Sequence, residues 1–204
     1  MIETLPLADL DRMVRAVELV RERLLRASAI LEAAGVSYAV IGGNAVAAWV
    51  SRKDESAVRN TRDVDILLRD EDLPAARAAL ESAGFVYRHV RNIDLFLDGP
   101  GTKARDGLHI LPANRRLNAD DPLSTPDPSE FLYDKDRLFR HMTLEGLVRL
   151  KLLANRDKDR THLQDLASVG LIDASWANQF PPPLDDRLRI ALNSPDAEPW
   201  PEDE

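Results

Sequence analysis

The segment from Ile41 to Leu68 constrains the chain more than any other part of its sequence. It reads IGGNAVAAW, then a spacer of mixed charge, then NTRDVDILL. Two glycines at the end of an apolar strand let a backbone turn approach a bulky group closely. Asp63 and Asp65 stand two positions apart, so both carboxylates are expected on one face of a second strand. Because such carboxylates repel each other unless a divalent cation lies between them, the pattern predicts a nucleoside triphosphate held over Mg²⁺ or Mn²⁺.

The composition places this pattern in an ordinary globular chain. Of 204 residues, 44% are hydrophobic and 30% are charged, which suits one good core, with or without a helical appendage. No apolar run approaches the roughly 20 residues that cross a bilayer, and the start MIETLPLADLDR lacks the order of a signal peptide. We therefore expect a cytoplasmic protein with no membrane partner. The absence of cysteine excludes disulfides, thiolate zinc sites and cysteine nucleophiles.

The charge distribution limits the partners. The formal net charge is −8, so the chain as a whole does not attract a polyanion, and DNA is not predicted as a partner. Arginines and lysines are nevertheless clustered locally, and these clusters are read either as a face for RNA or triphosphate or as solvated helix surfaces. The acidic tail 196–204 is expected to be disordered.

The apolar spacing predicts alternating helices and strands in the first two thirds of the chain. Helices are expected at 9–34, 44–50 and 73–83, and strands at 37–41, 64–68, 85–90, 93–97 and 108–111. The helix between the first two strands suggests that they are parallel neighbours. The three later strands, separated by turn-rich segments, suit an antiparallel extension of the sheet.

The last third of the sequence predicts helices. Residues 112–128 are rich in Pro, Asn and Asp and are expected to form a long surface loop. Thr143 is a good N-cap for a helix at 144–153, and further helices are expected at 158–169 and 184–192. The expected fold is α+β: an α/β core with a small mixed sheet flanked by helices, then a C-terminal helical bundle. The expected divisions are 1–35, 36–128, 129–195 and the tail 196–204.

These motifs resemble those of a known family. A Gly-Gly turn followed by Asp-x-Asp in a small α/β core resembles the nucleotidyltransferase superfamily, with the small mixed sheet of that fold. The segment LVRLKLLANRDKDRTHLQDL is similar to the K-x-x-A-x-R-x-K-D-x-x-[DH] helix of the AbiEii/MenT-like toxin branch and of related uncharacterised nucleotidyltransferases. The resemblance covers residues 28–172. It implies metal-dependent transfer of a nucleotide from a nucleoside triphosphate to a hydroxyl acceptor such as tRNA, and a toxin paired with an antitoxin protein.

The resemblance also implies roles for individual residues. Gly42, Gly43 and Asn44 would form the turn against the phosphates, while Asp63 and Asp65 would hold the metal and act in catalysis. The further residues of the implied nucleotide site are Thr61 and Arg62 before the aspartates, Lys151 as a catalytic point charge on the triphosphate or ribose, and Arg156, Lys158 and Asp159 along the same cleft.

One expected group departs from the pattern of the family. Active members carry a third carboxylate on a neighbouring strand, and GLHILPA places His109 there; Asp94 and Asp106 are the alternatives. His162 stands where the late helix often has Asp. A neutral histidine accepts a proton or binds a metal, but it supplies no negative charge.

Simpler structural roles stand beside these functional ones. The glycines would then form an ordinary turn, Asp65 would pair with Arg62 or Arg69, and Lys151, His109 and His162 would be packing residues. Three functions follow: a nucleotidyltransferase, a nucleotide-binding module without turnover, and an interaction protein whose acidic cleft binds a partner chain.

Overall fold

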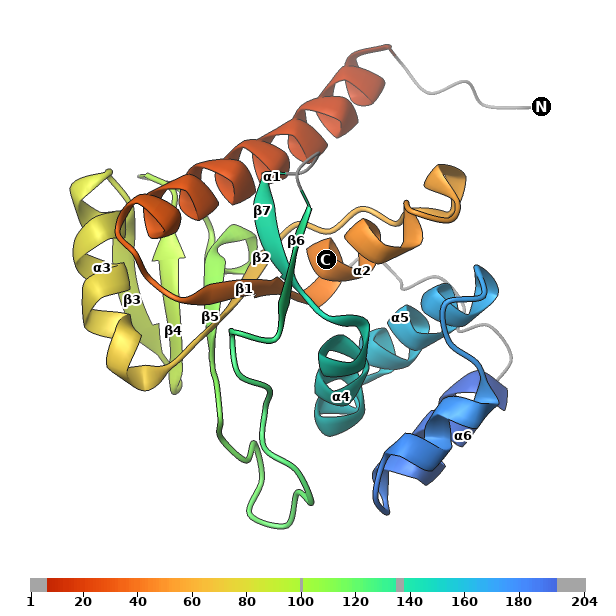
Figure 1. Ribbon diagram of the computed structural model, residues 1–204. Helices are drawn as coiled ribbons and strands as arrows, with labels where there is room; N and C mark the ends of the chain where they lie inside the picture. Colours follow the sequence, from red (N-terminus) through yellow and green to blue (C-terminus); the bar gives the residue numbers. More distant parts are fainter. Residues whose placement is uncertain (1–6, 100, 135–137, 194–204) are drawn as a thin grey trace.

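Seven strands form one mixed sheet, in the order β3-β4-β5-β2-β1-β7-β6 (Figure 1). The structure is a computed structural model that describes residues 7–99, 101–134 and 138–193, and the tail 196–204 lies outside them. The strands are β1 (Tyr38–Ile41), β2 (Val64–Leu68), β3 (Val86–Val90), β4 (Ile93–Leu97), β5 (Leu108–Pro112), β6 (Phe131–Asp134) and β7 (Phe139–Met142). The helices are α1 (Leu7–Ala33), α2 (Gly42–Val50), α3 (Leu73–Ser82), α4 (Leu144–Ala154), α5 (Asp157–Ser168) and α6 (Leu184–Asn193). The α+β class with a mixed sheet and flanking helices is confirmed.

The pairing of β1 with β2 is antiparallel, so the parallel arrangement expected from the intervening helix is wrong. After α2, residues 51–63 bring the chain back to the end of β1, and Ile41 pairs with Asp65. The side-chain amide of Asn44 donates to the carbonyl of Asp63 at 2.8 Å and fixes this return. The parallel pairs of the sheet are β2 with β5 and β1 with β7.

The hairpin of β6 and β7 was not predicted from the sequence. Its segment FLYDKDRLFRHM carries charged residues among the apolar ones, which hides the period-2 pattern of a half-buried strand. The two strands are antiparallel, and β7 joins the sheet beside β1 through Val40 and His141. The sheet therefore extends to the residue before the N-cap of α4.

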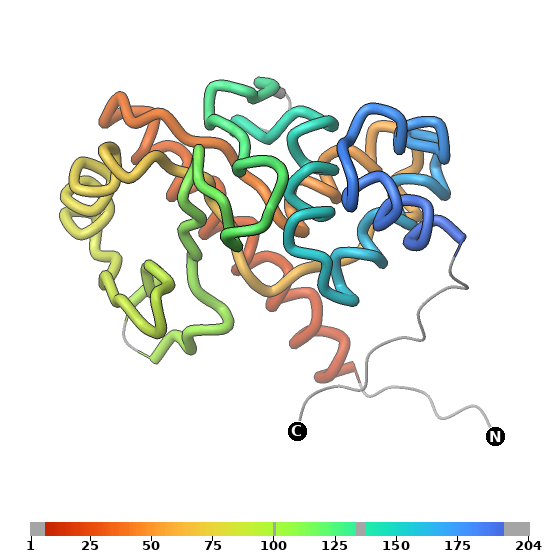
Figure 2. Tube along the Cα trace, turned by 90° about the horizontal axis from the view of Figure 1, so that it is seen from below, coloured from red at the N-terminus to blue at the C-terminus, as the bar shows by residue number. Residues whose placement is uncertain are grey.

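The two faces of the sheet carry different helices. Val64, Ile66 and Leu68 are buried in the core that α1 and α3 share, whereas Leu67 is buried in the core formed with α2, α4, α5 and α6. Because side chains alternate along a strand, Asp65 belongs to the second face, beside the C-terminal helices. Figure 2 shows α3 and α6 at opposite ends of the molecule.

Only the second half of α1 packs on the sheet. Leu24 and Leu31 are buried, but Leu10, Val14 and Val17, which share the helical periodicity, are 50%, 52% and 42% exposed. The first half of the helix projects beyond the sheet in both views (Figures 1 and 2). Among the described residues, no helix combines the length and the apolar character that crossing a membrane requires.

Candidate active site

A cleft of about 690 Å³ lies where the sheet meets α4 and α5. This volume suits a nucleotide-sized ligand. Both candidate glycines, both candidate aspartates and His109 line it from the sheet side. From the helical side it is lined by Lys151, Arg156, Lys158, Asp159 and His162. Segments far apart in the sequence thus converge on one hollow.

The glycine turn lies directly against the acidic pair. Gly42 opens α2 with a φ of 67°, a conformation that L side chains rarely adopt. A Cβ at Gly42 would overlap the carboxylate of Asp65, with the Cγ atom 2.8 Å away, and a Cβ at Gly43 would lie 2.9 Å from the Cβ of Thr61. Glycine is therefore required at Gly42 for the turn to approach Asp65, and at Gly43 for it to approach Thr61.

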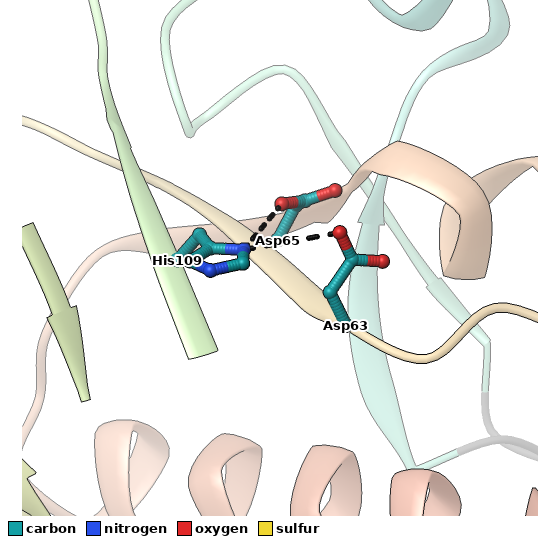
Figure 3. A group of neighbouring side chains, drawn as sticks. All are labelled: Asp63, Asp65 and His109. Atoms are coloured by element: carbon teal, nitrogen blue, oxygen red, sulfur yellow. Dashed lines mark ion pairs between the residues drawn. The ribbon is translucent and has the colours of Figure 1, made fainter. Parts of the chain in front are cut away.

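Asp63, Asp65 and His109 form one cluster (Figure 3). The Nδ1 atom of His109 lies 3.5 Å from Oδ1 of Asp65 and 3.8 Å from Oδ2 of Asp63. Its Nε2 atom lies 2.8 Å from the carbonyl oxygen of Ala104, so Nε2 donates and the Nδ1 side faces the carboxylates. The hydroxyl of Thr61 donates to Oδ1 of Asp63 at 2.6 Å. Each member of the cluster has its orientation fixed by a neighbour.

The cluster shifts the pKa values of its members. Burial alone would raise the pKa of Asp65, but the hydrogen bond and charge of His109, with the more distant charge of Lys151, outweigh it, and this pKa is lowered. The hydrogen bond to Asp65 raises the pKa of His109, against the opposing effect of burial. Without a metal, the cluster therefore favours a carboxylate and an imidazolium in contact.

His109 occupies the strand position beside the acidic pair. In the parallel pairing of β2 with β5, His109 is the partner of Asp65. Asp94 pairs across β4 and β5 with Ile110, which places it on the opposite face, where its carboxylate contacts Tyr87 and His89. Asp106 lines a different hollow. Of the three candidates for the third group, only His109 reaches the aspartates.

Lys151 and Asp159 form a buried ion pair between two helices. The Nζ atom of Lys151 lies 3.0 Å from Oδ1 of Asp159, and these side chains are 5% and 1% exposed. Asp159 also accepts from Arg156 at 2.7 Å and from the backbone at the start of α5. Its pKa is lowered because Lys151 and Arg156 outweigh burial. The pair holds α4 against α5, so a nucleotide role for either residue stays a prediction.

The exposed cations of the helical wall are Arg156 and Lys158. The Arg156 side chain is 61% exposed although it pairs with Asp159. Lys158 lines the cleft, and in the described part of the chain no carboxylate lies within 4.0 Å of its ammonium group. These two side chains are available to meet an anion that enters the cleft.

Other predicted residues lie at the edge of the cleft or outside it. The Asn44 amide binds the carbonyl of Asp63, so it braces the loop and does not line the cleft. Thr61 lines the cleft and also the second hollow beneath α1, whereas Arg62 lines only that second hollow. His162 lines the cleft, and burial followed by the charge of Lys151 lowers its pKa to about 3.

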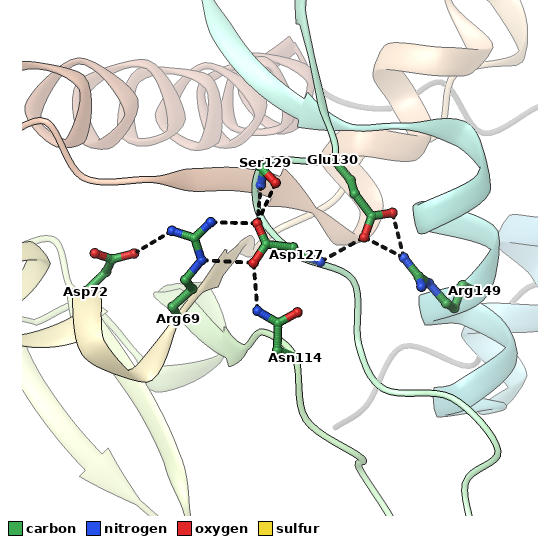
Figure 4. A network of polar contacts seen from close by, with 7 residues as sticks. All are labelled: Arg69, Asp72, Asn114, Asp127, Ser129, Glu130 and Arg149. Atoms are coloured by element: carbon green, nitrogen blue, oxygen red, sulfur yellow. Dashed lines mark hydrogen bonds and ion pairs between the residues drawn. The ribbon is translucent and has the colours of Figure 1, made fainter.

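The loop 112–128 contributes residues that the sequence did not single out. Leu117 and Asn118 line the cleft. Asp127 anchors the loop by accepting from Nε and Nη2 of Arg69 at 2.9 and 2.7 Å and from Asn114 at 2.6 Å (Figure 4). These bonds hold the pKa of Asp127 well below its usual range. The abundance of Pro, Asn and Asp predicted a loop, but neither this tertiary anchor nor the contact of the loop with the cleft.

Comparison with known proteins supports the fold. No model of a protein family matches the chain, and no curated protein matches it. The solution structure of the antibiotic-resistance factor ANT(2'')-Ia is similar with a TM-score of 0.50 and 14% identity, over 88% of this chain and 90% of that one. The crystal structure of ANT(2'')-Ia in complex with adenylyl-2''-tobramycin has a TM-score of 0.41 and 18% identity to this chain, and the match covers 86% of each chain. An antigenic nucleotidyltransferase-like protein from Paracoccidioides brasiliensis has a TM-score of 0.45 and 16% identity to this chain, and the match covers 85% of each chain.

At this level of identity the likeness shows a shared fold and not a shared activity. The chain has a nucleotidyltransferase fold, as expected from the glycine turn and the aspartate pair. The expected relation to the AbiEii/MenT-like branch is not confirmed and stays a prediction.

Proposed function

We propose that this protein is a nucleotidyltransferase that transfers a nucleotide from a nucleoside triphosphate to a hydroxyl acceptor. One observation carries the proposal: in a nucleotidyltransferase fold, the glycine turn and the aspartate pair meet in a nucleotide-sized cleft, and Gly42 touches Asp65. The opposite wall supplies Arg156 and Lys158. A triphosphate is recognised by such a combination of backbone turn, cations and metal-binding carboxylates.

The cluster fits a divalent cation. One ligand atom from each of Asp63, Asp65 and His109 lies within 4.8 Å of the others. The bond from Nε2 of His109 to the Ala104 carbonyl is the kind of contact that orients a metal-binding histidine. The two carboxylates would hold Mg²⁺ or Mn²⁺, with the imidazole as a third ligand. A bound cation would neutralise charge on the triphosphate.

The residues of the cleft account for the remaining requirements of transfer. The first turn of α2 would receive the triphosphate on its backbone N–H groups, and Arg156 and Lys158 would balance its charge. The acceptor oxygen forms a bond to the α-phosphorus, the bond from that phosphorus to the β-phosphate oxygen breaks, and pyrophosphate leaves. The proton of the hydroxyl passes to solvent in the open cleft. Catalysis would rest on positioning and electrostatics.

His109 favours one alternative function. Within the described residues, it stands where active members have a third carboxylate, so the cleft lacks that negative charge. A nucleotide-binding module without turnover fits this cluster as well. It would bind triphosphate and metal but release no pyrophosphate.

The toxin role and the tRNA acceptor rest on the resemblance of the late helix motif. Induced expression that arrests growth, and its relief by a variant of the aspartate pair, would support the toxin role. Growth that is unaffected by the wild-type protein would remove it.

The test is transfer of label from the four α-³²P nucleoside triphosphates to bulk tRNA or to small hydroxyl acceptors, with Mg²⁺ or Mn²⁺. Asp65→Asn should reduce the rate at least about a hundredfold, because it removes a charge at the reacting phosphates. Asp94→Asn is the matched control, since that acid lies on the other face of the sheet. Equal transfer by wild type and Asp65→Asn would overturn the proposal. Metal-dependent binding without transfer would select the module without turnover.

A further inference from the structure

A second hollow, of about 810 Å³, lies beneath α1 on the other side of Thr61. One wall is apolar and consists of Met13, Val17 and Val20 of α1. The other walls come from the loop 60–62 and from residues 101–106, which include the 3-10 turn η3 (Ala104–Asp106). None of the functions assigned above uses this hollow.

The polar part of the hollow is basic although the whole chain is acidic. Arg23, Arg62, Lys103 and Arg105 line it, against the single carboxylate of Asp106. In the described ranges, no carboxylate lies within 4.0 Å of the side-chain nitrogens of the last three cations. A local excess of positive charge is therefore held in a chain of net charge −8.

Arg23 supplies an independent sign of a missing ligand. Its side chain is 9% exposed, and its Nε and Nη1 atoms are buried without a hydrogen-bond acceptor in the described residues. Its ion-pair partner, Asp98, lies 3.8 Å from Nε, which is beyond hydrogen-bond distance, and also pairs with Arg26 at 2.6 Å. Two buried guanidinium nitrogens without a hydrogen-bond acceptor are costly, and an anion with several oxygens would supply acceptors to both.

The hollow adjoins the catalytic cluster. Thr61 lines both hollows, and its hydroxyl donates to Oδ1 of Asp63. A ligand held in this hollow would have to pass Thr61 to reach the aspartates, because Thr61 lies between the two hollows. In the proposed transfer, the triphosphate would reach the same aspartates from the first cleft.

We propose that this hollow is the acceptor site and that it binds a phosphate group of a phosphorylated acceptor, with the rest of the acceptor against Met13, Val17 and Val20 of α1. The inference rests on the proposed transferase function and names the class of its acceptor. Phosphate monoesters and the phosphodiesters of RNA share the chemistry that these cations recognise. A polycationic acceptor is repelled by the same four side chains.

The test measures binding to the metal-free, nucleotide-free protein by calorimetry. The probes are inorganic phosphate, ribose 5-phosphate, the RNA pentamer of uridylate, and tobramycin as a polycation. Arg62→Glu and Lys103→Glu alter exposed residues, and each should lower the affinity for the phosphate probes about tenfold or more. Arg88→Glu, an equal charge change on β3 outside the hollow, should leave the affinity unchanged. Arg23→Met should also weaken binding, while the melting temperature is maintained or raised.

The outcomes separate the inference from the function on which it rests. Binding of ribose 5-phosphate without the pentamer assigns a small phosphorylated acceptor, and binding of the pentamer assigns RNA; both support the site. The proposed phosphate site would be overturned if tobramycin binds more tightly than every phosphate probe. It would also be overturned if Arg62→Glu and Arg88→Glu lose equal affinity for the phosphate probes. Binding of triphosphate with metal is measured in parallel. If the protein binds triphosphate but none of the phosphate probes, the proposed acceptor site is wrong and the transferase proposal stands. If the phosphate probes bind but no triphosphate does, the transferase proposal falls and the phosphate site stands.

Discussion

His162 should make the protein sensitive to mild acid. Its side chain lies in α5 at the wall of the cleft, and Nδ1 is buried without a hydrogen-bond partner in the described residues. Burial, followed by the charge of Lys151, lowers its pKa from 6.5 to about 3. Protonation is therefore easier in the unfolded chain. The stability that depends on neutral His162 is complete above pH 6.5 and is lost as the pH falls from there toward 3.

The magnitude follows from proton linkage. Between pH 7 and pH 5 the unfolded histidine becomes protonated while the folded one stays neutral, which lowers the free energy of unfolding by about 2 kcal/mol. His162→Gln cannot titrate and should remove most of this loss. The opposite sign is expected for His109→Gln, because the pKa of His109 is raised in the folded state by Asp65. Protonation of His109 then stabilises the fold below its ordinary pKa, and the variant loses that stabilisation.

The assay is urea unfolding of the three proteins in EDTA at pH 7 and pH 5, followed by circular dichroism. The wild type should lose more stability than His162→Gln over this range, and His109→Gln should lose the most. A wild type and a His162→Gln protein with the same change between the two pH values would refute the reasoning, because the buried neutral imidazole would then have no energetic effect.

Two further substitutions test the geometry around the cleft. Gly42→Ala should lower the free energy of unfolding by about 1–3 kcal/mol more than Gly35→Ala does, as measured by chemical denaturation. Both residues have positive φ, but only the Cβ added at Gly42 overlaps Asp65. Equal losses of stability in the two variants would contradict the close approach of the turn to Asp65. Asp127→Ala should lower the free energy of unfolding by about 1–2 kcal/mol above pH 5 and speed tryptic cleavage at 115–116, because it releases the loop from its anchor. The stabilisation that Asp127 gives the wild type is lost as the pH falls below the ordinary aspartate pKa. Asp120→Ala, an exposed change in the same loop, should alter neither the stability nor the rate of tryptic cleavage. If Asp127→Ala behaves like Asp120→Ala, Asp127 does not anchor the loop.

Local chemistry in the sequence predicted the core of the site. The period-2 spacing of Asp63 and Asp65 and the need for glycine at a positive φ are properties of a few consecutive residues, so they could be recognised without the fold. The family resemblance placed the strand GLHILPA beside them, with Asp94 and Asp106 as alternatives to His109, and the pairing of His109 with Asp65 agrees with that placement.

Long-range features could not be predicted in the same way. The direction of β2 depends on the return of residues 51–63, which the bond from Asn44 to Asp63 fixes. The partner of Lys151 is Asp159 on the next helix, eight residues later, and the sequence motif alone does not distinguish an ion pair from a phosphate contact. Arg62 precedes the aspartates in the sequence, but the turn of the chain carries it into the second hollow.

The most direct measurement of the central claim is calorimetric titration of the four nucleoside triphosphates with and without Mg²⁺ or Mn²⁺. We expect binding of at least one triphosphate that requires the metal and is lost in Asp63→Asn and Asp65→Asn but kept in Asp94→Asn. Binding that depends neither on metal nor on the two aspartates, or no binding of any triphosphate, would contradict a metal-dependent triphosphate site at Asp63 and Asp65.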